Sequence, residues 1–203
     1  MANEILFPDQ EPDYVFDRDC LAFRAVVDGK PVECLVTAEL LIARFGAHDP
    51  SPTSLRGAYR EHLAEIQDIA RGHIQHGWID DERRVFLTRR YTRLTVDYDK
   101  GLRLWPEGLA LAEALEPGLI ELIGPNAGAV DLRWGVSGDP DKDKRAIILR
   151  LVDPEMSLVV SEGIGGVIPG KEKEQAKSLS ILLGKVWANF LRKRSWRLSL
   201  KSG

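Results

Sequence analysis

The stretch CLAFRAVVDGKPVECLVT, residues 20–37, predicts a β-hairpin and thereby decides the fold class of the chain. Apolar and polar residues alternate over about residues 20–27 and 31–36, as in half-buried strands. Asp28 and Gly29 lie between the two runs. An Asp-Gly pair is typical of a two-residue type I′ turn, because both of its positions need a positive φ. The fold therefore starts from an antiparallel strand pair.

The same hairpin keeps the two cysteines of the chain apart. With a two-residue turn, Phe23 lies opposite Cys34 and Cys20 lies opposite Thr37. The two sulfur atoms then point to opposite faces and lie on the order of 10 Å apart along the strands, too far for a disulfide. We expect both cysteines to be small, buried apolar residues.

The chain up to residue 100 continues as two helices and two strands. Thr37 is an N-cap and Gly46 a C-terminal stop for a short helix over residues 38–45. Ser51 or Ser54 caps a longer amphipathic helix that runs through about Gln75. The runs VFLT and LTVDY read as strands. Residues 1–100 are therefore predicted to form a small β-β-α-α-β-β domain.

The second half, residues 101–203, predicts an α-β-β-β-α region. WPEGLALAEALE is a helix with Pro106 in its first turn, and LIELIG continues it or forms a further turn. DLRWGVS, RAIILRLV and SLVVSEG are three strand-like runs. A final helix starts near Lys171 and carries a wide apolar stripe. Taken together, the two halves predict an α+β protein of two domains.

Composition narrows the class of protein. The chain has 203 residues, of which 44% are hydrophobic, enough for one large core or two small ones. It has no signal-like start and no apolar run long enough to span a bilayer, so we expect a soluble cytoplasmic protein. The net charge is −3, yet residues 184–203 carry six basic side chains and no acidic one. That basic block is a candidate for contact with an acidic partner.

The segment GGVIPGKE, residues 165–172, resembles a phosphate-binding P-loop in its glycines and lysine. A P-loop needs Ser or Thr where Glu172 stands, because that hydroxyl ligates magnesium. It also follows the first strand of a parallel sheet, whereas only one helix follows Lys171 here. We therefore interpret the segment as a turn whose acids complement the helix dipole, and expect no nucleotide cofactor.

The segment GDPDKDK offers three carboxylates at the spacing that opens a calcium-binding loop, Asp139, Asp141 and Asp143. A calcium loop needs glycine at its sixth position and glutamate at its twelfth, where this chain has Lys144 and Arg150. The segment is accordingly predicted to be a polar hairpin tip without a metal.

Three histidines near one edge of the long helix suggest a possible metal site, which their spacing tests. His62 lies eleven residues from His73, about 16 Å along a helix axis, so only His73 and His76 could share an ion. They would need Asp80 or Asp81 as a third ligand, so we expect histidines beside an apolar stripe and no metal. The two adjacent acids are expected to stay solvated in a polar turn rather than act as an acid–base pair.

Two basic segments carry the candidate binding residues. The first is the arginine-rich strand over residues 83–93, with aromatic residues between its cations, as in single-strand nucleic-acid sites: Arg84, Arg89, Arg90 and Arg93. The second is the C-terminal helix: Lys185, Arg192, Lys193, Arg194, Trp196 and Arg197. For this helix three interpretations remain open: a docked helix whose cations complement its dipole, a nucleic-acid patch, and an interfacial membrane helix.

The order FRAVVDGKPVECLVT, ELLIARFG, LAEIQDIARGHIQHG and VFLT resembles a family of small bacterial domains of unknown function, the one numbered 1488. The resemblance covers residues 14–91. It implies a compact α+β domain with no catalytic residues to carry over, followed here by some 110 further residues that do not resemble it. The matching positions are Phe23, Ala25, Val27, Asp28, Gly29, Val32, Cys34, Leu40, Phe45, Gly46, Ile66, Ala70, Ile74, Gly77, Leu87 and Thr88.

The sequence favours a non-enzymatic adaptor or regulator of unknown pathway that binds a protein partner through its C-terminal region. No convergent set of catalytic residues stands out. The alternative is a nucleic-acid-associated protein that uses the basic helix and the arginine-rich strand. A homodimer through an exposed sheet edge is compatible with either hypothesis, and an enzyme with an unrecognised site stays a third.

Overall fold

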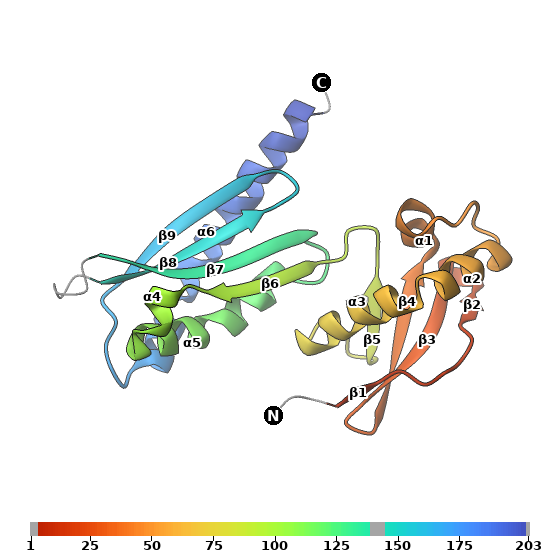
Figure 1. Ribbon diagram of the computed structural model, residues 1–203, viewed down its shortest axis with the longest axis horizontal. Coiled ribbons are helices and arrows are strands. Elements are labelled where there is room, and N and C mark those ends of the chain that lie inside the picture. The colour runs from red at the N-terminus through yellow and green to blue at the C-terminus, as the bar shows by residue number, and fades with distance from the viewer. Residues whose placement is uncertain (1–3, 139–144, 202–203) are drawn as a thin grey trace. The chain divides into compact units, whose positions relative to one another are not determined.

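The computed structural model describes residues 4–138 and 145–201, and the chain divides into two compact units (Figure 1). The first unit is Met1–Arg93 together with Pro125–Gly128, and the second is Leu94–Gly124 together with Ala129–Gly203. In the described part, no helix is both long and apolar enough to cross a membrane. The α+β class predicted from the sequence is confirmed.

The first unit is built on a five-stranded sheet of β1 (Ile5–Leu6), β2 (Asp13–Val15), β3 (Cys20–Val27), β4 (Lys30–Thr37) and β5 (Arg84–Leu87). Its order is β1-β3-β4-β5, with β2 also on β3, and a 3-10 turn η1 (Phe16–Arg18) leads into β3. β3 and β4 are antiparallel, whereas β5 runs parallel to β4. The sequence did not predict the two short strands β1 and β2.

The predicted hairpin register is confirmed. Cys20 lies opposite Thr37 and Phe23 lies opposite Cys34. The turn has φ values of 50° at Asp28 and 76° at Gly29, the two positive angles that a type I′ turn requires.

Helices cover one face of this sheet. In α1 (Ala38–Phe45), the Thr37 hydroxyl accepts a hydrogen bond from the Leu40 amide, and Gly46 ends the helix with a φ of 73°. The single helix predicted to run through Gln75 is wrong, because it breaks at His62 into α2 (Pro52–Glu61) and α3 (Leu63–Gln75). One straight helix of that span would extend about 36 Å, whereas the eight-residue strands extend about 27 Å. The break lets both halves cover the sheet.

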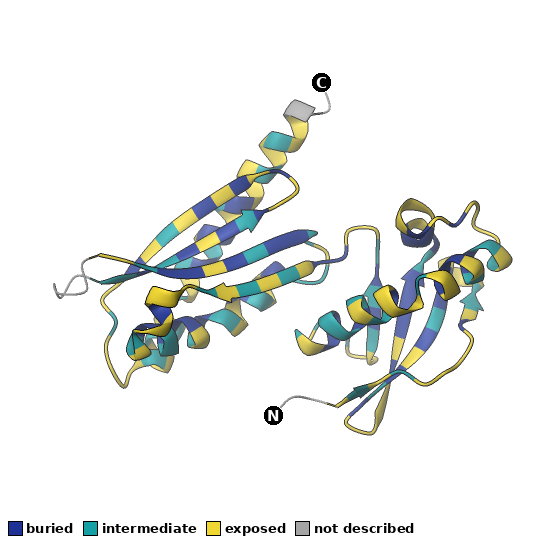
Figure 2. Ribbon diagram, viewed as in Figure 1, coloured by how far each residue is buried: buried dark blue, intermediate teal, exposed yellow. Residues whose placement is uncertain are grey.

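The core of the first unit lies between the helices and the inner face of the sheet, as the alternation of buried and exposed strand residues in Figure 2 shows. The outer face carries Cys20 and Leu35, which are buried outside this core. Phe86 is on the same face, opposite Leu35, with the guanidinium groups of Arg18 and Arg84 at 5.7 and 5.5 Å from its ring centroid. The two cations shield an outer aromatic ring.

A short loop after the first long helix of the second half returns to the first unit. The Pro125 carbonyl accepts a 2.8 Å hydrogen bond from the Thr92 amide, and the Gly128 carbonyl accepts one of 3.1 Å from the Arg93 amide. The Gly128 amide donates in turn to the carbonyl of Arg90 at 3.2 Å. Pro125–Gly128 therefore completes the backbone pairing of the segment that follows β5.

The second unit is a four-stranded sheet with helices on one face. Its order is β6 (Arg93–Tyr98), β7 (Ala129–Ser137), β8 (Ala146–Asp153), β9 (Leu158–Gly165), so that β6 and β9 are the edges. The β7-β8 and β8-β9 pairs are antiparallel. α4 (Lys100–Arg103) and α5 (Pro106–Ile123) connect β6 to β7, and α6 (Glu172–Lys201) follows β9. The three strands predicted for this half are confirmed, whereas β6, which the sequence analysis assigned to the first domain, belongs to this sheet.

Apolar residues from both helices cover the sheet. α5 and α6 pack against each other, α5 also against β8 and α6 also against β9. The inner strand residues alternate with exposed ones, and Trp134 at the centre of β7 is only 1% exposed. The helices contribute Leu111, Leu115, Leu119, Ile123, Leu183, Val186, Trp187 and Phe190 to this core. The carboxylates proposed as a calcium-loop start, Asp139, Asp141 and Asp143, lie outside the described residues.

Candidate interaction surface on the C-terminal helix

The loop before α6 uses its own helix to satisfy its backbone. The Ile168 amide donates to the Gln175 side chain at 2.7 Å, and the Gly170 amide donates to the Glu172 carboxylate at 2.8 Å. The Gln175 side chain also donates to the Gly166 carbonyl at 2.7 Å. In a P-loop such amides bind phosphate, whereas two of them here are bound to side chains of the first helical turns. Glu172 has a structural role.

The inner face of α6 is docked on the second unit. Leu183, Val186, Trp187 and Phe190 are all buried, and Phe190 is completely inaccessible to solvent. The rings of Trp187 and Phe190 stack with their centroids 5.3 Å apart. The helix is therefore docked, which is the first of the three interpretations of the C-terminal helix.

Two of the predicted binding arginines continue this inner face. Arg194 Nε lies 2.7 Å from Oδ2 of Asp153, a carboxylate at the end of β8 with no solvent exposure. The other oxygen of Asp153 accepts hydrogen bonds from the amides of Glu155 at 2.9 Å and Met156 at 3.0 Å. A buried carboxylate needs such partners, because an isolated buried charge is very costly. Arg194 thus fixes the turn between β8 and β9.

Arg197 holds the same turn one helical turn later. Its Nη1 donates to the carbonyl of Ser157 at 2.9 Å and also to the carbonyl of Met156. Ser157 has a φ of 50°, so it is a tight-turn residue whose carbonyl is presented to the helix. Arg194 and Arg197 serve the fold, and the prediction that they bind a partner finds no support in their contacts.

The other candidate residues of α6 lie on its opposite side. Ile181, Lys185, Arg192 and Trp196 recur at helical spacing and form what we call the outer stripe, about 22 Å long. All four are exposed, Ile181 at 72% and Trp196 at 64%. Lys193 borders the stripe and is also exposed. The outer stripe combines positive charge with large apolar side chains.

The predicted arginine-rich strand does not form one basic face. Strand β5 ends at Leu87, so only Arg84 of the four candidates lies on it. Arg84 Nη2 lies 2.9 Å from Asp80 Oδ2, and Arg84 also pairs with Glu82. Carboxylates therefore neutralise the cation that the strand presents.

The three remaining arginines of that segment lie in the turn that follows β5 and at the start of β6. Arg89 Nη1 is 3.4 Å from Glu39 in the first turn of α1, and both side chains are about two-thirds exposed. Arg90 and Arg93 are exposed. Arg89 and Arg90 border one depression together with Glu39, whereas Arg84 lies on β5 and is paired with carboxylates.

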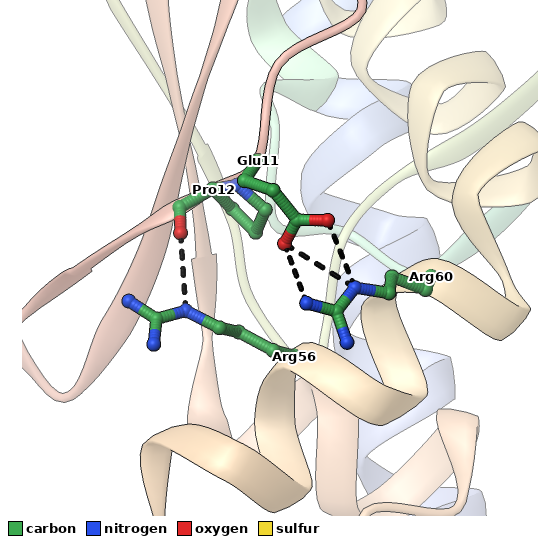
Figure 3. A network of polar contacts seen from close by, with 4 residues as sticks. All are labelled: Glu11, Pro12, Arg56 and Arg60. Atoms are coloured by element: carbon green, nitrogen blue, oxygen red, sulfur yellow. Dashed lines mark hydrogen bonds and ion pairs between the residues drawn. The ribbon is translucent and has the colours of Figure 1, made fainter.

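A polar network that the sequence did not predict ties the N-terminal segment to α2 (Figure 3). The Glu11 carboxylate accepts hydrogen bonds from Arg60 Nε at 2.9 Å and Nη2 at 2.8 Å. One helical turn earlier, Arg56 Nε donates to the Pro12 carbonyl at 3.3 Å. The hydrogen bonds from Arg60 lower the pKa of Glu11. This network orders the chain between β1 and β2.

Both cysteines and three of the four histidines, His62, His73 and His76, are packing residues of the first unit. Burial raises the pKa of the Cys20 thiol and raises that of Cys34 to about 12, so neither thiol is activated. His62 packs on the Phe45 ring and His76 on that of Trp78. In the described residues, no three His, Cys, Asp or Glu side chains come together as metal ligands.

His73 is the most perturbed of these groups. Its side chain is 1% exposed and makes an edge-to-face contact with Trp78, with centroids 5.1 Å apart. Burial lowers its pKa to about 4; the Thr92 backbone partly offsets this lowering, and the nearby His76 adds to it. The imidazole is therefore neutral at physiological pH and part of the core.

A shallow depression lies on the outer face of the first sheet. Its volume is about 480 Å³, and it is bordered by the cross-strand pair of Arg24 and Glu33 and by Glu82 and Arg83. Arg24 and Glu33 are exposed. Charged groups in contact with water are poor general acids or bases at neutral pH, so this depression offers no evident catalytic chemistry.

The comparisons with known proteins concern the first unit. A family model described as Protein of unknown function (DUF1488) matches residues 5–87. The uncharacterized protein YrdB of Escherichia coli (strain K12) is 30% identical over 87 residues, which are 43% of this chain and 99% of that protein. YrdB of Shigella flexneri matches to the same extent.

One solved structure is also similar. It is the crystal structure of a protein of unknown function from the DUF1488 family, from Shewanella loihica PV-4. The sequence identity is 15% and the TM-score is 0.40, over 43% of this chain and 94% of that chain.

Proposed function

We propose, for a chain that belongs to the DUF1488 family of proteins of unknown function, that it acts as a non-enzymatic interaction protein whose outer stripe on α6 binds an acidic protein partner. The observation that carries this proposal is the division of cations on one helix. Arg194 and Arg197 face inward and are bound, whereas Lys185 and Arg192 are exposed on the side of the helix that carries the exposed Ile181 and Trp196.

The docked core makes the outer stripe a preformed surface. Because four large apolar residues anchor α6, its outer residues are presented on a rigid helix and a partner need not order them. Arg192 is further held by a 3.0 Å hydrogen bond to the Asn189 side chain. Rigid presentation lowers the entropic cost of binding.

The chemistry of the stripe favours a protein over a nucleic acid. Ile181 and Trp196 are large exposed apolar residues at its two ends, with Lys185 and Arg192 between them. Tryptophan and arginine are enriched where protein interfaces gain most of their binding energy. A nucleic acid would instead need many cations along the path of its phosphate backbone, and Arg84 of the arginine-rich segment is already paired with carboxylates.

An acidic amphipathic helix is the partner that fits these features best. Its apolar face would contact Ile181 and Trp196, and its carboxylates would pair with the cations between them. The neighbouring sequence adds no competing charge, because residues 184–203 contain no Asp or Glu.

The test uses the full chain and defined probes. We expect a helical peptide rich in Glu and Leu to bind the wild type in fluorescence anisotropy, and a peptide of the same composition in scrambled order to bind at least about tenfold more weakly. The double variant Arg192→Glu/Lys193→Glu and the variant Trp196→Ala should each weaken binding of the helical peptide. Lys30→Glu, an exposed cation of the first unit, is the matched control and should leave the affinity unchanged.

A duplex DNA and a single-stranded RNA of defined length are run beside the peptides at several salt concentrations. Binding of either nucleic acid with a steep salt dependence, together with no preference for the acidic helix, would establish the nucleic-acid alternative instead. Absence of binding to every probe would overturn the proposal. We expect all variants to fold, because the substituted side chains are exposed. Circular dichroism checks this.

A further inference from the structure

Strand β9 is a long sheet edge whose single charged side chain is Glu162. It has eight residues, LVVSEGIG, with no proline and no lysine. Among the described residues, its backbone hydrogen bonds run to β8 on one side, and none is found on the other. Unpaired amides and carbonyls in a row are a template for another strand, and proteins normally block them with short strands, prolines or charges.

The other sheet edges of the chain carry such protection. In the first unit, β1 has two residues and β5 has four. In the second unit, the opposite edge β6 carries the exposed charges Arg93 and Asp97. Only β9, among the described edges, is both long and largely uncharged. Among the described edges, β9 is therefore the strongest candidate for pairing with another strand.

The side chains of β9 fit a second copy of the same strand. In an antiparallel pair, opposite residues share a face, so a two-fold axis at Ser161 sets Val159 opposite Gly163. It also sets Leu158 opposite Ile164, both buried on the helix-covered face, and Val160 opposite Glu162. In this register no like charges are directly opposite, and the exposed Val159 meets a residue without a side chain.

From this edge and its self-complementary register, we propose that two copies of the chain pair through β9 to form a continuous eight-stranded sheet. The pairing is antiparallel and isologous, with Ser161 at the axis. Val159, which is 51% exposed in the single chain, lies at the new strand pair. The proposal does not depend on the outer stripe, because that stripe lies on the solvent side of α6.

The decisive experiment is the dimer dissociation constant of the full chain measured by sedimentation equilibrium. The variant Val159→Lys/Gly163→Lys sets like charges opposite each other twice in the proposed register and should raise the constant at least about tenfold. The variant Val159→Lys/Gly163→Glu sets opposite charges there instead and should restore a constant within about threefold of the wild type. A side chain at Gly163 is tolerated within one copy, because its Cβ would lie 3.7 Å from Ile148, an ordinary contact.

Val152→Lys is the matched control, because Val152 lies opposite Val159 on the same face but on the inner strand β8. It should leave the dissociation constant unchanged if pairing is edge to edge. A monomeric wild type at the highest soluble concentration would overturn the proposal. So would equal disruption by Val152→Lys, which would indicate face-to-face packing, or failure of the Lys/Glu variant to restore the dimer while circular dichroism shows it to be folded.

Discussion

Protonation of His73 should destabilise the first unit as the pH falls through the weakly acidic range. The buried imidazole has a pKa of about 4, whereas a histidine in the unfolded chain has one near 6.5. The unfolded state therefore binds a proton at a higher pH than the folded state does. Stability from this group is fully present above pH 6.5 and is lost as the pH falls toward 4. At 1.36 kcal/mol for each pH unit, the loss amounts to about 3 kcal/mol.

Urea unfolding followed at several pH values between 7 and 4 measures this loss. The free energy of unfolding of wild type should fall relative to that of His73→Leu, in which the position cannot titrate, and the difference between the two should change by about 3 kcal/mol. Taking the difference cancels the contributions of the acidic groups that titrate in both proteins to the free energy of unfolding. His48→Gln, at an exposed position, controls for the loss of one histidine. A difference that stays constant over this range would refute the assignment of His73 as a neutral core residue.

Three further substitutions test other parts of the fold. Asp153→Ala leaves Arg194 without its buried carboxylate and should lower the free energy of unfolding of the second unit by about 3–5 kcal/mol in urea titrations; a loss under about 1 kcal/mol would contradict a buried ion pair. Gly135→Ala would place a Cβ in overlap with the Asp99 carboxylate. It should lower the melting temperature, with a loss of about 1–3 kcal/mol in the free energy of unfolding. An unchanged melting curve would count against that close approach. Gly46→Ala must adopt a φ of 73° and should cost about 1–2 kcal/mol in the same assay, whereas a stabilised variant would disprove the left-handed cap.

The hairpin is the part of the fold that the sequence predicts most completely. Alternation, the Asp28-Gly29 turn and the strand lengths all act within one short segment, so they determine the register without knowledge of distant residues. The break at His62 was not predictable in this way. It has neither glycine nor proline to mark it, and His62 leaves the helical conformation with a φ of −113° and a ψ of 22°.

The inward direction of Arg194 and Arg197 could have been predicted in part. With Leu183, Trp187 and Phe190 they continue one series at helical spacing, so they belong to the docked side of α6. What the sequence does not reveal is why charged residues are tolerated there. The answer is a carboxylate and two turn carbonyls, contributed by a hairpin about 40 residues earlier in the chain.

The apolar face of the second sheet also bears on synthesis at the ribosome. β7, β8 and β9 leave the ribosome before α6 does, so the face that Phe190 and its neighbours cover stays bare until most of that helix has been translated. The first unit needs nothing beyond Gly128 and can fold while translation continues. A nascent chain halted between β9 and α6 would therefore have a folded first unit and an apolar sheet surface that α6 does not yet cover. Chaperones recognise intermediates of this kind.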